Sequence, residues 1–290
     1  MTNFDPVVVE SFGKEWSKFN QGEVDPAELR AIFDTYFAIF PWDALPAGAE
    51  GFDLGCGSGR WAYYVSSRVG RLHCIDPSPE ALNIARRNLS PIENCEFHCA
   101  SVEAIPFPDG SFDFGYSVGV LHHVPDPQKG VAECARKLKP GAPFLIYLYY
   151  AFDNRPLWFR ALWRASDLLR RLVSKLPFKI KSPLCDLLAA LVYWPLARTG
   201  RLLEWFGLKV EHLPLSAYRN RSFYLMRNDA LDRFGTRVER RFARAEIRQM
   251  MEQSGLERIT FSESPCWCAV GYKNSFPDQS SPQDSKVAFG

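Results

Sequence analysis

The sequence of 290 residues lacks the features that mark exported and membrane-spanning proteins. Its first residues, MTNFDPVVVESFGKEW, contain acids and no basic start followed by an apolar run. We therefore expect no signal peptide and a cytoplasmic protein. The longest low-charge run, LLAALVYWPLA at 187–197, has about half of the roughly 20 residues that a membrane span needs. This run is expected to be too short to cross a membrane.

Cysteine usage gives no indication of a disulfide framework. Eight cysteines without a signal peptide are typical of reduced thiols. Alternate residues of a strand face the core, and both cysteine-rich stretches look like strands, so we expect buried thiols and no metal. The alternative is a structural metal ion. The spacing of Cys95, His98 and Cys99, or of Cys266 and Cys268, would allow such a site.

The net charge is small, but the charges are unevenly distributed. The net charge is +2, yet residues 151–242 contain 18 Lys and Arg against 8 Asp and Glu, a balance of +10, which leaves −8 for the remainder. Such a basic segment indicates an anionic substrate or an anionic surface. The alternative is that long basic side chains solubilise apolar helices. Because we find no nucleic-acid recognition motif, no nucleic-acid partner is expected.

Strand-like and helix-like runs alternate through the first half of the chain. Alternation of this kind predicts parallel pairing with right-handed crossovers, and so a doubly wound α/β sheet. A helix is expected at 27–40, where Asp25, Pro26 and Glu28 form a capping-box pattern. Seven strands of a mostly parallel sheet are expected at 51–55, 71–76, 95–100, 112–117, 143–150, 256–263 and 267–274.

These patterns divide the chain into five parts. They are an N-terminal helical cap at 1–45, an α/β core at 46–150, a largely helical, basic and aromatic insertion after strand five at 151–242, a C-terminal helix with the last two strands at 243–274, and a polar tail at 275–290 that we expect to be disordered.

The stretch FDLGCGSGR at 52–60 predicts a strand followed by a ligand-binding turn. Its spacing is G-x-G-x-G, at Gly55, Gly57 and Gly59. A dinucleotide fingerprint is G-x-G-x-x-G, which would require glycine where Arg60 stands, so NAD is disfavoured. Asp76 ends the next strand and is well placed to accept hydrogen bonds from two ribose hydroxyls.

Four ordered motifs resemble class I S-adenosylmethionine-dependent methyltransferases, specifically the type 11 group. They are FDLGCGSGR, CIDPSPEALNIARRN, ASVEAIPFPDGSFDFGYSVGVLHHVPDP and KPGAPFLI. The resemblance covers residues 50–150 well and 244–274 loosely. An F-G-x-x-W pattern frequent in the family matches Phe12, Gly13 and Trp16.

The resemblance implies a Rossmann-like fold, S-adenosylmethionine as the cofactor, and a set of cofactor-binding residues. One departure concerns Ser101, where the family commonly has an aspartate, and it weakens the hydrogen bond from adenine by about 1 kcal/mol. The implied residues are Asp53, Gly55, Cys56, Gly57 and Gly59 for the methionine part, Asp76 and Pro77 for the ribose, Ser101 and Val102 for the adenine, Ser117 and Val118 beneath the sulfonium, and Phe12 and Trp16 as a lid.

Methyl transfer to a hydroxyl needs a base, and VLHHVPD supplies candidates near the expected methyl position. His122 and His123 have a suitable side-chain pKa, and His123 is preferred as the catalytic residue. The alternative is that the pair packs and fixes its loop.

The insertion is expected to choose the acceptor. A helix within 156–181 has an apolar stripe that includes Leu162, Leu169 and Leu172, with arginines on other faces. It is interpreted as a lid packed on the domain; the alternative is peripheral contact of 156–197 with an anionic membrane. The candidate acceptor-binding residues are Tyr147, Tyr149, Tyr218, Arg219, Arg221 and Tyr224.

The sequence thus predicts a methyltransferase with a small-molecule acceptor. The preferred reaction is O-methylation of an anionic or glycosylated metabolite. One alternative is N- or C-methylation of a lipid-like or quinone-like acceptor at the membrane surface. An alternative of another class is a non-catalytic module that binds the cofactor and recruits a partner.

Overall fold

The computed structural model describes residues 3–152, 155–263 and 267–275. The expectations for Cys266 and for residues 276–290 of the polar tail fall outside these residues.

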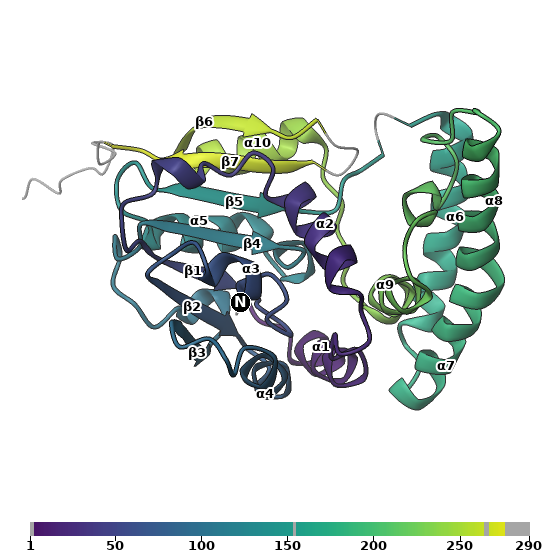
Figure 1. The fold of residues 1–290 in the computed structure, drawn as a ribbon, viewed down its shortest axis with the longest axis horizontal. Helices are drawn as coiled ribbons and strands as arrows, with labels where there is room; N and C mark the ends of the chain where they lie inside the picture. The colour runs from purple at the N-terminus through teal and green to yellow at the C-terminus, as the bar shows by residue number, and fades with distance from the viewer. Residues whose placement is uncertain (1–2, 153–154, 264–266, 276–290) are drawn as a thin grey trace, which may run out of the picture.

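A seven-stranded sheet forms one half of the molecule (Figure 1). Its spatial order is β3-β2-β1-β4-β5-β7-β6, with the first five strands parallel and β7 antiparallel to both of its neighbours. This confirms the predicted doubly wound, mostly parallel sheet. The strands are β1 (Glu50–Leu54), β2 (Arg71–Asp76), β3 (Cys95–Cys99), β4 (Phe114–Val118), β5 (Pro143–Tyr147), β6 (Leu256–Phe261) and β7 (Cys268–Lys273).

Helices cover the sheet because its strands are apolar on both faces, as parallel strands are. Ser78 and Asp126 cap α4 and α5 by accepting backbone N–H groups, and proline follows each cap. Phe52 and Phe144 are fully buried on one face of the sheet, and Phe114 and Tyr116 on the other. The covering helices are α3 (Ala62–Ser66), α4 (Pro79–Asn88), α5 (Pro127–Lys137) and α10 (Arg244–Gln253), and short 3-10 turns η1 (Trp42–Ala44), η2 (Val102–Ala104) and η3 (Leu121–His123) join the elements.

Two N-terminal helices lie over the edge where the parallel strands end. They are α1 (Pro6–Lys18) and α2 (Pro26–Tyr36), capped by Asp5 and Asp25. The capping box predicted for α2 does not form as expected, because Glu28 accepts a hydrogen bond from Ser222 N at 2.8 Å. Glu28 therefore ties α2 to the insertion.

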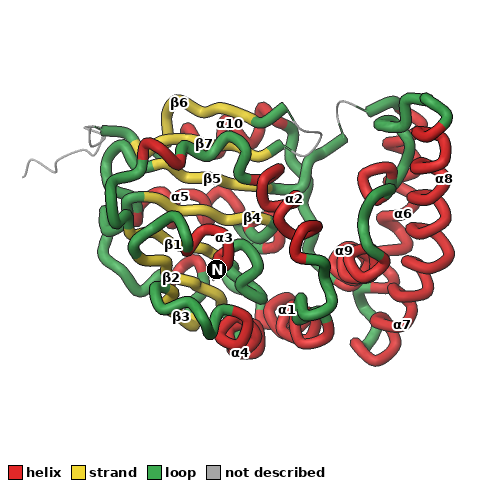
Figure 2. Tube along the Cα trace, in the orientation of Figure 1, coloured by secondary structure: helices red, strands yellow, loops and turns green. Residues whose placement is uncertain are grey.

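The insertion is a helical layer beside the sheet (Figures 1 and 2). Helix α9 packs against α1, α6 and α7 and so joins this layer to the rest of the molecule. Its buried side includes Met226, Ala230 and Leu231. The elements are α6 (Leu157–Val173), α7 (Phe178–Leu188), a π-helical turn η4 (Ala189–Tyr193), α8 (Trp194–Trp205), a 3-10 turn η5 (Ser216–Tyr218) and α9 (Phe223–Gly235).

The elements α7, η4 and α8 form one continuous helical segment, Phe178–Trp205, of 28 residues. By length and composition this segment could cross a membrane. The expectation of a stretch too short to span was based on the run 187–197 alone, and it is wrong for the longer helix that contains this run. A third of its most apolar window (33%) is buried inside the protein. Cys185, Ala189 and Tyr193 supply part of that buried side.

Candidate active site

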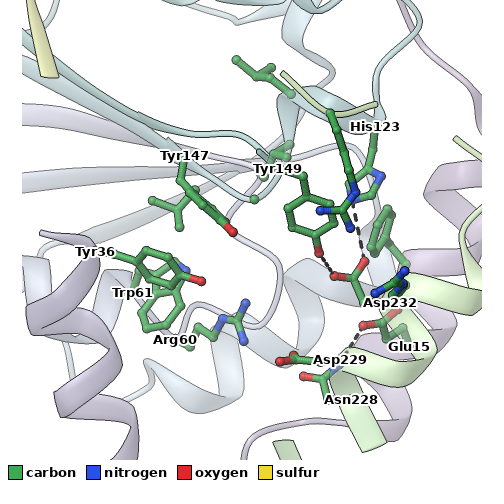
Figure 3. Close-up of a pocket in the computed structure, with 18 of the residues that line it drawn as sticks. Glu15, Tyr36, Arg60, Trp61, His123, Tyr147, Tyr149, Asn228, Asp229 and Asp232 are labelled. Atoms are coloured by element: carbon green, nitrogen blue, oxygen red, sulfur yellow. Dashed lines mark hydrogen bonds and ion pairs between the residues drawn. The ribbon is translucent and has the colours of Figure 1, made fainter. Parts of the chain in front are cut away.

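A cavity of about 510 Å³ opens where the parallel strands end. The residues after β1, β2, β4 and β5 form its floor, α1 and α2 cover it, and α9 closes the side toward the insertion (Figure 3). Ligands of open α/β sheets bind at this edge. The cavity has two ends, a core end made by the strand loops and an insertion end made by α9 and its neighbours.

The glycine loop at the core end requires glycine for two reasons. Gly55, Gly57 and Gly59 have φ values of +76°, +54° and +78°, which side chains rarely tolerate. A Cβ on Gly57 would lie 2.7 Å from the Trp16 ring, and one on Gly55 would lie 2.4 Å from Val120. The backbone is thus held close to the cavity, with Trp16 directly over the loop.

Asp76 is held at the core end by two backbone donors. Its Oδ2 accepts from Gly57 N at 3.0 Å and its Oδ1 from Ser78 N at 2.9 Å. Burial raises the pKa of Asp76 to about 6, and these two donors oppose the rise. Each carboxylate oxygen keeps acceptor capacity toward the cavity, which suits a pair of ribose hydroxyls.

The other predicted cofactor residues separate into two groups. Asp53, Gly57, Gly59 and Ser117 are absent from the cavity wall: burial raises the pKa of Asp53 to about 8, and Ser117 Oγ donates to Leu54 O at 3.1 Å. Asp53 and Ser117 lie behind the loop, which corrects the expectation of direct contact for their side chains, and Gly57 and Gly59 belong to the part of the loop that does not line the cavity. The residues that do line the cavity are Phe12, Trp16, Gly55, Cys56, Asp76, Pro77, Ser101, Val102 and Val118.

Only one histidine of the predicted pair faces the cavity. His123 lines it, whereas His122 is fully buried and stacks on Tyr149 with ring centroids 3.8 Å apart. Burial lowers the pKa of His122 well below its usual range. Neither ring nitrogen of His122 contacts a partner among the described residues, so this ring packs rather than titrates.

The ring of His123 is oriented so that its Nε2 faces α9. Its Nδ1 lies 2.6 Å from Val238 O, and because a carbonyl only accepts, Nδ1 bears the hydrogen. Nε2 is then free to accept a proton, and it lies 3.6 Å from Asp232 Oδ1. Tyr149 donates a hydrogen bond to the other oxygen of Asp232 (Figure 3). His123, Asp232 and Tyr149 therefore form one proton-handling cluster.

Buried acids at the insertion end were missed by sequence reasoning. Glu15 accepts from Asn228 Nδ2 at 2.7 Å, and burial raises its pKa well above the usual range. Burial also raises the pKa of Asp232, and raises that of Asp229 to about 6 against the opposing charge of Arg60. The sequence does contain a signal that could have identified this side of α9, namely side chains at helical spacing. The residues that recur in this way and line the cavity are Leu225, Asn228, Asp229, Asp232 and Arg233.

Four of the six predicted acceptor-binding residues line the cavity: Tyr147, Tyr149, Tyr218 and Arg221. The other two do not, which corrects the expectation for them. Arg219 is drawn to Glu204, with nitrogen–oxygen distances of 2.8 and 2.9 Å. The hydroxyl of Tyr224 accepts from Gln21 N at 3.0 Å, and its ring meets Phe19 edge-on.

The cysteine pattern does not converge on a shared site. Cys95 is buried and Cys99 exposed, whereas His98 Nε2 lies 3.0 Å from His73 Nδ1. His73, Glu96 and His98 bring ligand atoms close enough to hold a metal ion. A hydrogen bond from His73 Nε2 to Glu50 Oε1, at 2.7 Å, continues this chain, and hydrogen bonding alone accounts for the cluster.

Comparison with known proteins gives a consistent family. A family model described as a methyltransferase domain matches residues 52–146. A ubiquinone biosynthesis O-methyltransferase of Xanthomonas axonopodis pv. citri (strain 306) is 30% identical over 132 residues, covering 45% of this chain and 54% of that protein. A 2-methyl-6-phytyl-1,4-hydroquinone methyltransferase of Synechocystis sp. (strain ATCC 27184 / PCC 6803 / Kazusa) is 30% identical over 131 residues, covering 44% and 41%.

The likeness in three dimensions extends beyond the matched domain. The structure of an O-methyltransferase family protein from Burkholderia thailandensis superposes with a TM-score of 0.53 at 15% identity, covering 89% of this chain and 59% of that one. At that identity the match concerns the fold. The chain spans 32%, 54% and 41% of the length of the first curated relatives that it matches.

Proposed function

The chain belongs to the type 11 group of class I S-adenosylmethionine-dependent methyltransferases, and we propose that it methylates a hydroxyl oxygen of an aromatic acceptor. One observation supports this most: a single cavity joins the Asp76 end to the His123–Asp232 pair. A cofactor cradle and a proton acceptor therefore open into the same enclosed space.

The core end fits S-adenosylmethionine. The glycine loop has no room for side chains, since a Cβ would meet Val120 at Gly55 or Trp16 at Gly57, and Asp76 presents both carboxylate oxygens beside it. Ser101 and Val102 line the same cavity and would flank the adenine, with Trp16 beside the loop. When bound there, S-adenosylmethionine supplies an electrophilic methyl group; the chain itself orients the acceptor and moves its proton.

His123 is the proposed general base. Its Nε2 would accept the proton of the acceptor's hydroxyl, and the Asp232 carboxylate 3.6 Å away would stabilise the imidazolium that results. Val238 O holds the ring through Nδ1, so Nε2 stays directed at the cluster. Tyr149 fixes Asp232 by donating to its other oxygen.

The cavity as a whole has aromatic walls that suit a ring-shaped acceptor. Tyr36, Trp61, Tyr147 and Tyr218 line it, and Figure 3 shows the first three on the side across from Asp232. Glu15, Asp229 and Asp232 add carboxyl groups whose raised pKa values favour their neutral forms, and Arg155, Arg221, Arg233 and Arg241 also line the cavity. The charges therefore do not exclude the anionic acceptor predicted from the sequence, and the support for a phenol comes from the aromatic lining. By their names, one similar protein is an O-methyltransferase of ubiquinone biosynthesis and another methylates a phytyl hydroquinone, which supports an aromatic acceptor.

The test measures methyl transfer from labelled S-adenosylmethionine to paired phenols. A phenol of pKa about 10 is neutral at pH 7 and needs a base, whereas a nitro-substituted phenol ionised at pH 7 does not. His123→Gln should lower kcat for the first phenol by about 100-fold or more and leave the second nearly unchanged. His98→Gln, outside the cavity, is the matched control and should alter neither rate.

Two outcomes would contradict the proposal. The acceptor class is wrong if the protein methylates simple amines and no phenol. The role of His123 is wrong if His123→Gln slows both phenols equally while cofactor affinity, measured by calorimetry, is unchanged.

A further inference from the structure

Helix α6 has its polar side turned inward. Asp167 and Arg170 are buried, with Arg170 Nε 2.6 Å from Asp167 Oδ1 and its Nη1 2.9 Å from Thr236 O. The apolar stripe predicted for this helix faces solvent instead: Leu162 is 52% exposed and Leu172 67%. The expectation that this stripe packs on the domain is therefore wrong for Leu162 and Leu172, whereas Val173 at the end of the stripe is buried. A helix placed this way leaves most of its apolar stripe without a partner among the described residues.

The continuous segment Phe178–Trp205 repeats the arrangement. Its inner side, with Cys185, Ala189 and Tyr193, packs on α9. Its outer side has large apolar residues at helical spacing, all of them exposed: Ile180, Leu187, Leu191, Trp194, Leu202 and Trp205. Both long helices of the insertion thus turn apolar stripes away from the protein.

These stripes make an unusual concentration of apolar surface. Of the 20 exposed large hydrophobic residues among the described residues, 16 fall between residues 157 and 208. We call these 16 residues the outer face. Figure 1 shows α6, α7 and α8 on the side of the molecule farthest from the sheet. Concentrated exposed apolar area marks an interaction site.

The charged side chains around the outer face are mostly basic. Residues 155–209 contain 11 Lys and Arg and 3 Asp and Glu. Each acid is already paired: Asp167 with Arg170 and Arg171, Asp186 with Lys18 and Arg227, and Glu204 with Arg219. Arg164, Lys175, Lys179, Arg201 and Lys209 form no ion pair with any residue that the structure describes. The partner that complements this face is therefore both apolar and anionic.

We propose that the outer face binds the surface of an anionic phospholipid bilayer, with α6 and Phe178–Trp205 lying in the plane of the interface. Apolar side chains would enter the acyl boundary while arginines and lysines meet lipid phosphates. A second copy of the chain joined symmetrically through this face would set like charges against each other. A nucleic acid would leave the leucines and tryptophans exposed. Lys181 and Ser182 are buried against the protein, which opposes a spanning arrangement of this segment.

The proposal is tested by sedimentation of the full chain with vesicles. The protein should sediment with vesicles of phosphatidylcholine that contain about 30% phosphatidylglycerol, an anionic lipid. Far less of it should sediment with vesicles of pure phosphatidylcholine. Binding should weaken as salt rises, because screening shortens the reach of the charges. Leu162→Ser with Leu172→Ser should reduce partitioning by roughly tenfold or more.

Charge variants give a matched control. Arg164→Glu with Lys175→Glu changes the net charge by −4 at the outer face, and Arg87→Glu with Lys129→Glu makes the same change on exposed helices of the core. We expect the first pair to reduce binding to anionic vesicles by roughly tenfold or more and the second to have little effect. An equal loss for both pairs would show only general attraction of a basic protein, and would overturn the proposal.

Three other results would also overturn it. One is no binding to either vesicle by folded protein. Another is a dimer, seen by light scattering, that dissociates on Leu162→Ser with Leu172→Ser while vesicles are ignored. The third is membrane-bound protein that resists release by high salt and alkaline carbonate, which would indicate a spanning helix. None of these measurements depends on methyl transfer, so they stand apart from the proposed reaction.

Discussion

The α/β core and the insertion use apolar residues in opposite ways. In the core, Phe52 and Leu72 are fully buried between the sheet and its helices. In α6 of the insertion, Leu162 and Leu172 face solvent while Arg170 is buried. The same amphipathic pattern therefore has two outcomes. Apolar periodicity indicates which side of an element will be removed from water, but not whether the same chain covers it.

The two regions also divide the cavity between them. The core provides the glycine loop and Asp76, whose positions follow from strand ends and tight turns. The insertion provides Asp229, Asp232 and Tyr218 through α9 and η5, which reach the cavity only by tertiary packing. The glycine loop, Asp76 and His123 thus come from the region with motifs, whereas the acids of α9 come from the region without them.

The largest expected effect is on the free energy of unfolding, and it is tested by substituting one buried ring and one exposed leucine. Phe52 packs against Phe112 and Phe144, with ring centroids at 5.2 and 6.1 Å. Phe52→Ala should lower the free energy of unfolding by about 3–5 kcal/mol, because it removes apolar contacts and leaves a cavity. Leu172→Ala should change it by no more than about 0.5 kcal/mol. Chemical denaturation measures both, and a loss above 2 kcal/mol for Leu172→Ala would mean that the outer face is packed in solution.

The second effect concerns the polar inner side of α6. Arg170→Met places an apolar side chain at a buried position, yet it should lower the free energy of unfolding by about 2–3 kcal/mol. The variant removes hydrogen bonds to Thr236 O and Arg237 O and leaves Asp167 with Arg171 alone.

Arg171→Met is the matched control for that change, because Arg171 also pairs with Asp167 but is mostly exposed. An exposed pair of this kind should contribute at most about 1 kcal/mol. If Arg170→Met instead stabilises the protein, the inner side of α6 is not held by polar contacts as described, and the contrast between the two regions fails.

The core was predictable because local signals and tertiary structure agree there. The mostly parallel sheet, the glycine turn and the site of Asp76 all follow from alternation and motif spacing. Side-chain contact was harder to predict: Asp53 and Ser117 carry motif positions, yet they support the loop from behind. A motif records which residues the turn needs, not which of them reach the ligand.

The insertion was predictable in its helices but not in their packing. Composition indicated a basic, helical segment, and α6 through α9 are its result. Which side of α6 faces inward depends on the carbonyls of residues 236 and 237, far along the chain, that Arg170 binds. Arg219 likewise turns toward Glu204 rather than the cavity. These partners are distant in sequence, so no local pattern could identify them.

The smallest expected effect is a pH dependence of cofactor binding, and it compares the two regions inside the cavity. Burial raises the pKa of both Asp76 in the core and Asp229 in the insertion to about 6. Ribose hydroxyls donate to the ionised carboxylate, so cofactor binding favours the deprotonated form of Asp76. Affinity for S-adenosylhomocysteine should therefore be constant above about pH 7, fall as pH drops below about 6, and be about tenfold weaker at pH 5. Calorimetric titration across this range measures it.

Matched amide variants assign that pH dependence to one region. Asp76→Asn should weaken binding at pH 7.5 by about 10- to 30-fold, since a charge-assisted acceptor is lost, and should remove the fall at low pH. Asp229→Asn should keep both the affinity and the fall, because Asp229 lies at the acceptor end. If the two variants exchange these behaviours, the cofactor reaches into the insertion end. The division of the cavity into a core end for the cofactor and an insertion end for the acceptor would then be wrong.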